Sequence, residues 1–210
     1  MLDQILDFDT NLFRLINHCR SGFGDWFFSI LSAHITIAIA VVLITIYVMF
    51  KNNFKYWYLY VLVIGLCFLL ADRISVMCFK DVFCRLRPSH ALIDAITVKL
   101  KHFSYLIYDN KGGLYGFVSS HAANTFSIIT VMFLIMRKHK ATIFSSLIIA
   151  WGVLTGYSRV YCGYHYPGDV LCGALLGITI GVVIYFIYKY LFNKLESFHN
   201  NKTCKTKTND

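Results

Sequence analysis

Residues 141–192 read ATIFSSLIIAWGVLTGYSRVYCGYHYPGDVLCGALLGITIGVVIYFIYKYLF, two long apolar runs joined by one polar turn. The turn at 158–169 holds Arg159, His165 and Asp169. Apolar runs of about twenty residues are long enough to cross a bilayer as helices. Ionisable residues at membrane depth cost about 2.5–3.5 kcal/mol each, so grouping three of them in one turn indicates a functional site.

The whole chain has the composition of a membrane protein. Of its 210 residues, 57% are hydrophobic and only 15% are charged, whereas soluble domains carry about 25% charged residues. Five apolar stretches qualify as membrane spans, at roughly 26–50, 56–79, 119–136, 141–157 and 167–192. We therefore predict an all-α integral membrane bundle of about five transmembrane helices, formed by a single domain over residues 1–192.

The two ends of the chain differ from these spans. Residues 1–20 combine an apolar helical stripe with interrupting charges, which predicts an amphipathic helix on the membrane surface or against the bundle. This segment lacks the basic start and the cleavage site of a signal peptide, so we expect it to be retained. Residues 193–210 are polar and bear several lysines, which predicts a disordered tail.

The distribution of cations predicts the orientation in the membrane. The short loops KNNFK (51–55) and RKHK (137–140) and the tail from Lys189 are dense in positive charge. Such segments favour the cytoplasmic side of a membrane. The loop 81–118 and the turn 158–166 are therefore expected on the outer face, and the tail on the cytoplasmic face.

Charge and cysteine content narrow the possible partners. The formal net charge is +9, but no basic arm with interleaved aromatic residues is present, so no nucleic-acid partner is expected. The seven cysteines lack zinc-site spacing, which predicts no metal site built on thiols. Most cysteines lie in apolar runs and are interpreted as small hydrophobic residues. Cys84 and Cys162 lie near polar motifs, and a disulfide between them stays open as an alternative.

A second polar cluster is KDVFCRLRP, residues 80–88. Lys80 and Arg87 are seven residues apart, two helical turns, so we expect them to share a helix face. Pro88 disfavours helix at the preceding residue and predicts that the helix ends at Arg87. Two cations on one face are typical of a receptor for an anion with several oxygens. Arg85 is interpreted as a structural or lipid-headgroup contact.

The third cluster is GFVSSHAAN, residues 116–124, where a predicted span begins. Ser119 and Ser120 are favoured helix N-caps, and free amides at a helix N-terminus attract anions. His121 follows directly. All three clusters fall at outer ends of predicted spans, so the bundle can gather them around one anion.

The polar turn supplies a candidate nucleophile. Asp169 lies four residues after His165, within the first turn of the next predicted helix. From there its carboxylate can accept the N–H of the imidazole ring, which leaves the other ring nitrogen free to attack. Together the clusters offer three cations, two histidines and one acid, the residue types that phosphate binding and phosphoryl transfer require.

In order and spacing, these residues resemble the three signature motifs of the type 2 phosphatidic acid phosphatase (PAP2) superfamily. The matching patterns are Lys80-x6-Arg87-Pro88, Ser119-Ser120-His121 and Ser158-Arg159-x5-His165-x3-Asp169. The resemblance covers about residues 55–190. The second motif departs from the usual Pro-Ser-Gly-His, because Val118 and Ser120 replace the proline and the glycine.

The resemblance implies hydrolysis without metal or other cofactor, through a phosphohistidine. His165 would attack phosphorus, Asp169 would orient its ring, and His121 would protonate the leaving oxygen and then activate water. The residues implied to hold the phosphoryl oxygens are Lys80, Arg87, Ser119, Ser120 and Arg159. Three cations can neutralise a phosphate without magnesium, which is the physical reason to expect no metal.

The stretch SSHAAN is similar to short members of the superfamily from Gram-negative envelopes, including lipid A phosphatases. This implies a phosphorylated membrane lipid as substrate, with the 4′-phosphate of lipid A expected first, and no obligatory protein partner. It also implies the bacterial inner membrane, with the site facing the periplasm. The alternatives are undecaprenyl pyrophosphate or phosphatidylglycerophosphate as substrate, and a catalytically silent lipid-binding protein.

Overall fold

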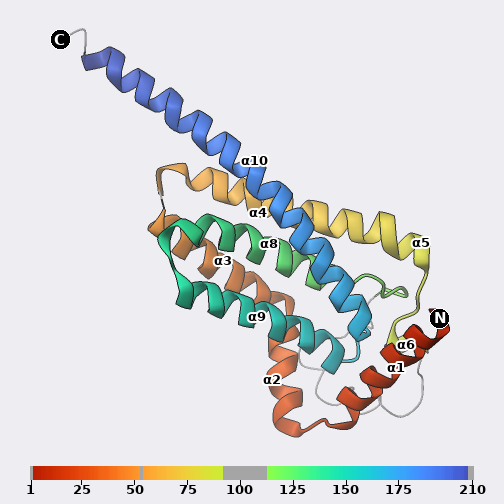
Figure 1. Ribbon diagram of the computed structural model, residues 1–210. Coiled ribbons are helices and arrows are strands. Elements are labelled where there is room, and N and C mark those ends of the chain that lie inside the picture. The colour runs from red at the N-terminus through yellow and green to blue at the C-terminus, as the bar shows by residue number, and fades with distance from the viewer. Residues whose placement is uncertain (1, 53, 92–112, 208–210) are drawn as a thin grey trace.

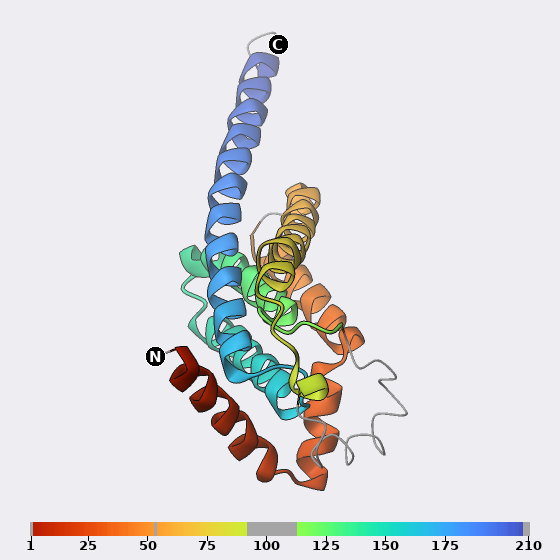
Figure 2. The same cartoon turned by 90° about the vertical axis from the view of Figure 1, so that its right-hand side faces the viewer.

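Long helices lie side by side in this protein and form one bundle (Figures 1 and 2). A computed structural model describes residues 2–52, 54–91 and 113–207. The helices in chain order are α1 (Leu2–His18), α2 (Gly22–Ser32), α3 (His34–Lys51), α4 (Trp57–Ile74), α5 (Asp81–Phe83), α6 (Pro88–Ala91), α8 (Ser120–Met136), α9 (Thr142–Tyr161) and α10 (Pro167–Lys207). Shorter turns are the 3-10 helices η1 (Phe54–Tyr56) and η3 (Arg137–His139) and the π-helix η2 (Ser75–Lys80).

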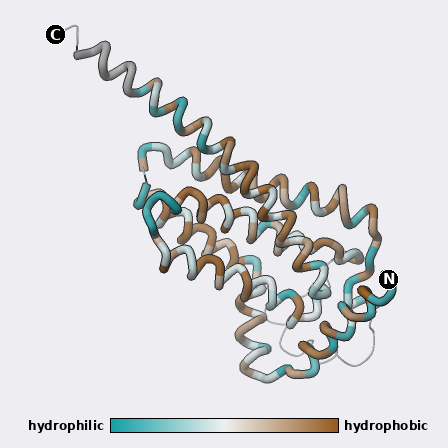
Figure 3. Tube along the Cα trace, viewed as in Figure 1, coloured by the Kyte–Doolittle hydropathy of each residue, from teal (hydrophilic) through white to brown (hydrophobic). Residues whose placement is uncertain are grey.

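Four helical stretches are long and apolar enough to cross a membrane. They are His34–Lys51, Phe54–Phe83, Thr142–Tyr161 and Pro167–His199. Helix α8 adds a fifth apolar helix of 17 residues, most of whose side chains are buried inside the bundle. Figure 3 shows apolar residues along these helices and polar residues at the connections between them. The predicted all-α membrane bundle is therefore the fold that is observed.

The predicted start of the first span, 26–50, is wrong. Helix α2 ends at Ser32, and Ala33 has an extended backbone (φ −69°, ψ 138°), so that α3 begins anew at His34 in a different direction (Figure 1). The break is stabilised because the hydroxyl and the carbonyl of Ser32 accept hydrogen bonds from Nη1 of Arg159, at 2.6 and 3.3 Å. Only 34–51 keeps the character of a span.

The prediction that Lys80 and Arg87 share a helix face is also wrong. Helix α5, which follows η2, ends at Phe83 because the next residue, Cys84, has a left-handed backbone (φ 47°) that stops the helix before Arg87. The chain beyond is extended, and the Arg87 amide donates to the Leu114 carbonyl at 3.1 Å. Pro88 then begins α6 rather than ending a helix. The two cations are brought together by this return of the chain.

Helix α10 extends beyond the predicted span 167–192. It continues to Lys207, where the composition predicted a disordered tail over 193–210 (Figure 1). Phe192 and Leu195 still pack against the hydrophobic core, which explains why the helix does not end with the span. Residues 208–210 lie outside the described part of the chain.

Helices α8 and α10 approach each other through a row of glycines. Gly173, Gly177 and Gly181 are four residues apart and therefore share one face of α10. A Cβ atom at Gly173 would lie 2.5 Å from the carbonyl oxygen of Ser119, the N-cap of α8, and a Cβ atom at Gly177 would overlap the carbonyl oxygen of Ala123. Only glycine permits this backbone contact. The contact also aligns the two helix starts, and the Ser119 amide donates to the Asp169 carbonyl at 2.9 Å.

The cationic connections lie at one end of the bundle and the polar clusters at the other (Figure 1). Nε2 of His139, after α8, lies 2.9 Å from Oδ1 of Asn52, after α3. The two loops predicted to share one side of the membrane are therefore neighbours. Which side they occupy stays a prediction.

Helix α1 packs on the polar turn. Phe13 is buried and meets the ring of Tyr166 edge to face, at 5.4 Å between centroids. Nδ2 of Asn17 donates to the Val160 carbonyl at 3.1 Å. The outward face of α1 is apolar and exposed, at Ile5, Phe8 and Leu15. The helix thus packs against the bundle, which is one of the two predicted arrangements, and leaves an apolar face exposed.

The glycine contact predicts a strong position dependence of stability. Gly177→Ala is expected to destabilise the fold by about 1–3 kcal/mol, because its Cβ meets backbone that cannot move aside. Gly65→Ala on α4 is the matched control, since a Cβ there has no atom within 4 Å. The measurement is the thermal unfolding midpoint of each variant in detergent. Equal midpoints for the two variants would contradict the contact.

Candidate active site

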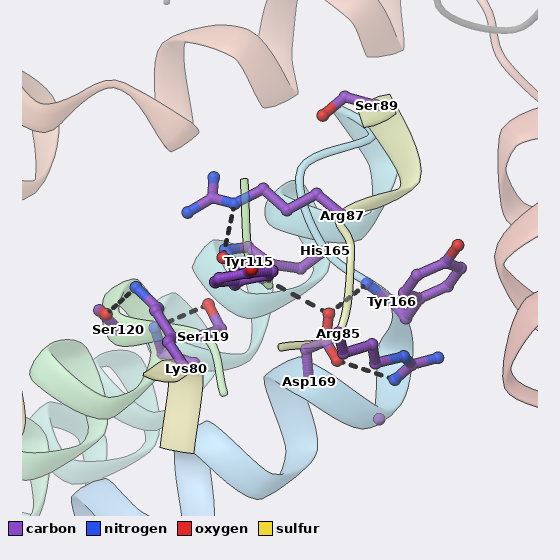
Figure 4. Close-up of polar contacts among 12 residues, drawn as sticks. Lys80, Arg85, Arg87, Ser89, Tyr115, Ser119, Ser120, His165, Tyr166 and Asp169 are labelled. Carbon is purple, nitrogen blue, oxygen red and sulfur yellow. Dashed lines mark hydrogen bonds and ion pairs between the residues drawn. The ribbon is translucent and has the colours of Figure 1, made fainter. Parts of the chain in front are cut away.

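The three polar clusters of the sequence meet at one end of the bundle (Figure 4). Lys80 and Ser120, 40 positions apart, are joined by a hydrogen bond of 2.6 Å. Arg85 and Asp169, 84 positions apart, form an ion pair of 2.8 Å. The candidate site is therefore assembled from the end of η2, the segment between α5 and α6, and the ends of α8, α9 and α10.

Lys80 is positioned by an unusual turn of helix. It is the last residue of the π-helix η2, a conformation that is rare and frequent at functional sites. Nζ of Lys80 donates to Oγ of Ser120, which also shares a hydrogen bond of 2.7 Å with Oγ of Ser75. Ser120, which replaces the glycine of the related Pro-Ser-Gly-His motif, thus positions Lys80 through its hydroxyl. The sequence did not predict this contact.

Arg87 reaches the site from the extended segment. Nε of Arg87 donates to the Tyr115 carbonyl at 3.1 Å, and the side chain is largely buried. At Gly116 a Cβ atom would lie 3.0 Å from Oδ2 of Asp169 and 3.2 Å from Cγ of Arg87. A side chain there would crowd both groups, so this glycine permits the close approach of arginine and carboxylate.

Arg159 is the most buried of the candidate cations, at 2% exposure. Its guanidinium lies over the ring of Tyr164, at 4.3 Å from the centroid, while Nη1 donates to Ser32. Its Nε is buried and makes no hydrogen bond within the described residues. The carbonyl of Arg159 accepts the amides of Tyr164 and His165, at 3.0 and 3.3 Å, through a turn at Gly163 with φ 78°. The backbone therefore ties His165 directly to the arginine.

His165 and Asp169 face each other inside the protein. His165 is 1% exposed and Asp169 is fully buried. Nδ1 of His165 lies 3.6 Å from Oδ2 of Asp169, longer than a hydrogen bond. The carboxylate therefore lies on the Nδ1 side of the imidazole ring.

The surroundings of His165 favour its neutral form. Burial lowers the pKa of His165 well below its ordinary value, and the positive charges of Arg159, Arg87 and Lys80 lower that pKa further. A neutral imidazole carries the lone pair that a nucleophile needs. The same three cations that would repel a proton would attract a phosphate.

His121 and Ser119 occupy the start of α8. Oγ of Ser119 accepts the amide of Ala122 at 3.4 Å, so it serves as the helix N-cap. Nε2 of His121 is buried and has no hydrogen-bond partner among the described residues. The ring of His121 lies 4.5 Å from that of His34 and within electrostatic reach of Arg159. A buried polar atom costs free energy unless a ligand or solvent pairs with it, so this nitrogen suits a bound polar group.

Sequence reasoning missed Asp9 and did not identify the partners of Arg85. Arg85, interpreted as a structural or headgroup contact, pairs with the buried carboxylate of Asp169 at 2.8 Å and with Asp9 of α1 at 2.7 Å. Oδ1 of Asp9 also accepts the amide of Gly168 at 2.7 Å. The available signal was an acid on the inner face of an otherwise apolar amphipathic stripe.

The charges of the site suit an anion. Within the described ranges no three His, Cys, Asp or Glu side chains converge in a way that could hold a metal ion. The converging groups are instead cationic, and three guanidinium or ammonium groups bind and neutralise phosphate oxygens. Cys84 is exposed and Cys162 is buried, and both are free thiols, so the disulfide left open by the sequence is not formed.

Comparison with known proteins agrees with the motifs. The model of the PAP2 superfamily matches residues 61–193. The lipid A 4′-phosphatase of Bacteroides thetaiotaomicron is 32% identical over 198 residues, which cover 94% of this chain and 84% of that protein. The lipid A 4′-phosphatase of Porphyromonas gingivalis is 30% identical over 191 residues, covering 90% of this chain and 76% of that protein.

Two solved structures share the fold. A transmembrane PAP2 type phosphatidylglycerolphosphate phosphatase from Bacillus subtilis aligns with a TM-score of 0.60 and 22% identity, over 91% of this chain and 87% of that one. The crystal structure of Aquifex aeolicus LpxE aligns with a TM-score of 0.53 and 24% identity, over 83% and 93% of the two chains. These likenesses confirm the predicted helical membrane fold.

The electrostatics of the site predict how His165 titrates. Because burial and three cations lower its pKa, the ring is expected to stay neutral as the pH falls below about 6.5, its unperturbed value. The measurement is an NMR titration of ¹⁵N-histidine-labelled protein in detergent, with the signal assigned from His165→Gln. Arg87→Met should raise the midpoint, whereas Arg20→Met, which removes a cation outside this cluster, should not. A wild-type midpoint at or above 6.5 would contradict this prediction.

Proposed function

Since this chain belongs to the PAP2 superfamily, as its motifs predicted, and is a membrane lipid phosphatase, we propose that it removes the 4′-phosphate of lipid A. The observation that carries the proposal is the meeting of His165, Asp169 and three cations at one end of the bundle. The substrate assignment is supported by the two lipid A 4′-phosphatases, which match this chain over 94% and 90% of its length.

The site suits an amphiphilic substrate at the edge of the bilayer. The polar clusters lie at the end of the bundle opposite the cationic connections, while the helix surfaces along the bundle are apolar (Figure 3). A lipid can therefore keep its acyl chains in the membrane while its phosphate enters from the interface. The positive-inside tendency supports a site on the periplasmic face of the inner membrane.

The first half of the proposed reaction forms a phosphohistidine. Nε2 of His165 attacks phosphorus in line, and the bond from phosphorus to the lipid oxygen breaks. His121, which this step requires in its doubly protonated form, gives a proton to that oxygen, so the lipid leaves as an alcohol. Asp169 balances the positive charge that the His165 ring acquires.

The second half returns the enzyme to its starting state. His121, now deprotonated, takes a proton from water, whose oxygen attacks phosphorus. The bond between phosphorus and Nε2 of His165 breaks, and inorganic phosphate leaves. Lys80, Arg87 and Arg159 hold the phosphoryl oxygens through both steps, while the main-chain start of α8 at Ser119 adds amide dipoles. The side chain of Ser120 contributes by holding Lys80.

Lipid analysis tests the substrate. Expression of the chain in a Gram-negative host whose lipid A carries a phosphate on each terminal sugar should yield lipid A with one phosphate fewer. Tandem mass spectrometry should assign the loss to the 4′ position. The His165→Gln variant, expressed at the same membrane level, should leave lipid A intact because it lacks the nucleophile. Unchanged lipid A with the wild type, together with altered undecaprenyl or phosphatidylglycerol phosphates, would overturn the substrate assignment.

Trapping tests the covalent intermediate. With p-nitrophenyl phosphate, whose leaving group needs no acid, His121→Ala should still form the phosphoenzyme. Its hydrolysis should slow by about 10²–10⁴-fold, because the general base is missing. We expect a burst of nitrophenolate equal to the enzyme present and an acid-labile phosphate on the protein. His165→Gln in the same background should abolish both, and a burst that survives it would contradict attack by His165.

A further inference from the structure

Helix α1 lies outside residues 61–193, the part of the chain that matches the family model, yet it reaches the candidate site. Its Asp9 is largely buried and connects to Asp169 through one arginine. We propose that Arg85 and Asp9 are positioning residues, which hold the Asp169 carboxylate in the orientation that aims His165 at phosphorus. This inference rests on the proposed function of the site and extends it to α1.

The two oxygens of Asp169 have separate partners. Oδ1 accepts a charged hydrogen bond from Nη1 of Arg85 at 2.8 Å. Oδ2 accepts the Tyr166 amide at 3.0 Å and faces Nδ1 of His165 at 3.6 Å (Figure 4). The arginine thereby fixes the rotation of the carboxylate. Without it, the oxygen that now faces arginine would be a buried acceptor without a partner, and the carboxylate would rotate toward other donors.

Arg85 is itself held on three sides. Nη2 pairs with Oδ2 of Asp9 at 2.7 Å while Nη1 pairs with Asp169. The guanidinium lies over the ring of Tyr166, 4.1 Å from its centroid. This ring is in turn packed against Phe13 of α1. A planar fork held between two carboxylates and an aromatic face has one orientation, which lysine cannot reproduce.

Asp9 connects this chain of charges to the start of α10. Its Oδ1 accepts a hydrogen bond of 2.7 Å from the amide of Gly168, the residue before Asp169. At Gly168 a Cβ atom would lie 2.8 Å from Oδ2 of Asp9, so the glycine permits the contact. The negative charge of Asp9 also offsets the positive charge of Arg85. Asp169 therefore keeps its electrostatic effect on the imidazole, which becomes positive during the reaction.

Neither residue touches the groups assigned to phosphate in the described structure. Within the described residues, the Arg85 side chain contacts Asp169, Asp9 and the ring of Tyr166, and the Asp9 side chain contacts Arg85 and Gly168. Their effect must therefore pass through Asp169 to His165. This predicts a loss in the rate of the chemical step rather than in substrate binding.

Steady-state kinetics separate these effects, using whichever phosphomonoester the wild type hydrolyses. Arg85→Met should lower kcat by about 10–100-fold, the usual loss when an outer-shell partner of a reacting group is removed, with KM within about 3-fold. Asp9→Asn should lower kcat less, and Arg85→Lys should recover only part of the loss. Asp9→Asn should add little in the Arg85→Met background, because the two act as one unit.

A second ion pair provides a matched control. Arg20 pairs with Asp25 at 2.7 Å and lies over the ring of Tyr161 at 5.3 Å, as Arg85 does over Tyr166. Arg20→Met should also lower the thermal midpoint, but by less than Arg85→Met because Asp25 is more exposed than Asp169, and it should leave kcat unchanged. A raised KM with unchanged kcat in Arg85→Met would overturn the proposal in favour of direct phosphate binding. Equal loss of kcat in both variants would overturn it in favour of a purely structural role.

An activity-independent measurement separates this inference from the proposed substrate and reaction. ¹⁵N NMR of labelled histidine should show His165 as a single tautomer protonated at Nδ1 in the wild type. Arg85→Met should show a mixture of tautomers, while Arg20→Met should match the wild type. This result would support the inference even if lipid A were not the substrate. An unchanged tautomer in Arg85→Met would overturn it even if lipid A phosphate were lost as proposed.

Discussion

The backbone contact between α8 and α10 is the constraint on which the site depends. Glycines on one face of α10 bring the helix so close to α8 that a Cβ atom at these positions would overlap backbone oxygens of the facing segment. This contact fixes the register of the two helices, and with it the distance between the Ser119 and Asp169 backbones. In a bilayer, where apolar side chains gain little by leaving lipid, such close van der Waals packing is an effective way to hold helices together.

Charge is then placed where the packing allows it. Arg159 and Arg87 are buried with part of their hydrogen-bonding capacity spent on backbone and hydroxyl oxygens, so the protein supports them without cancelling their charge. Buried cations next to a neutral histidine form a site that favours an anion and keeps His165, the proposed nucleophile, unprotonated. The cations proposed to bind phosphate are thus the same cations that favour the neutral form of His165.

The carboxylates occupy a separate layer behind the histidine. Moving away from His165, the charges are negative at Asp169, positive at Arg85 and negative at Asp9. Both ion pairs in this row are shorter than 3 Å, whereas Asp169 lies 3.6 Å from the His165 ring. An amphipathic helix that would otherwise serve only to lie at the membrane interface is thereby joined to the chemistry. This arrangement explains why an acid is buried on α1 although the helix precedes the family domain.

The sequence alone determined the membrane class, the approximate spans from 56 onward, and the residues that form the motifs, because hydropathy and motif spacing are local properties. The sequence predicted that Lys80 and Arg87 share one helix face. In the structure the left-handed backbone of Cys84 ends the helix, and Arg87 lies in a segment paired with Leu114. The sequence also missed the partners of Arg85, since contacts between Asp9 and residues 85 and 168 depend on how distant helices pack. The sequence shows which residues can carry charge or donate a proton. Which buried charges pair is decided only by tertiary packing, because packing removes the water between them.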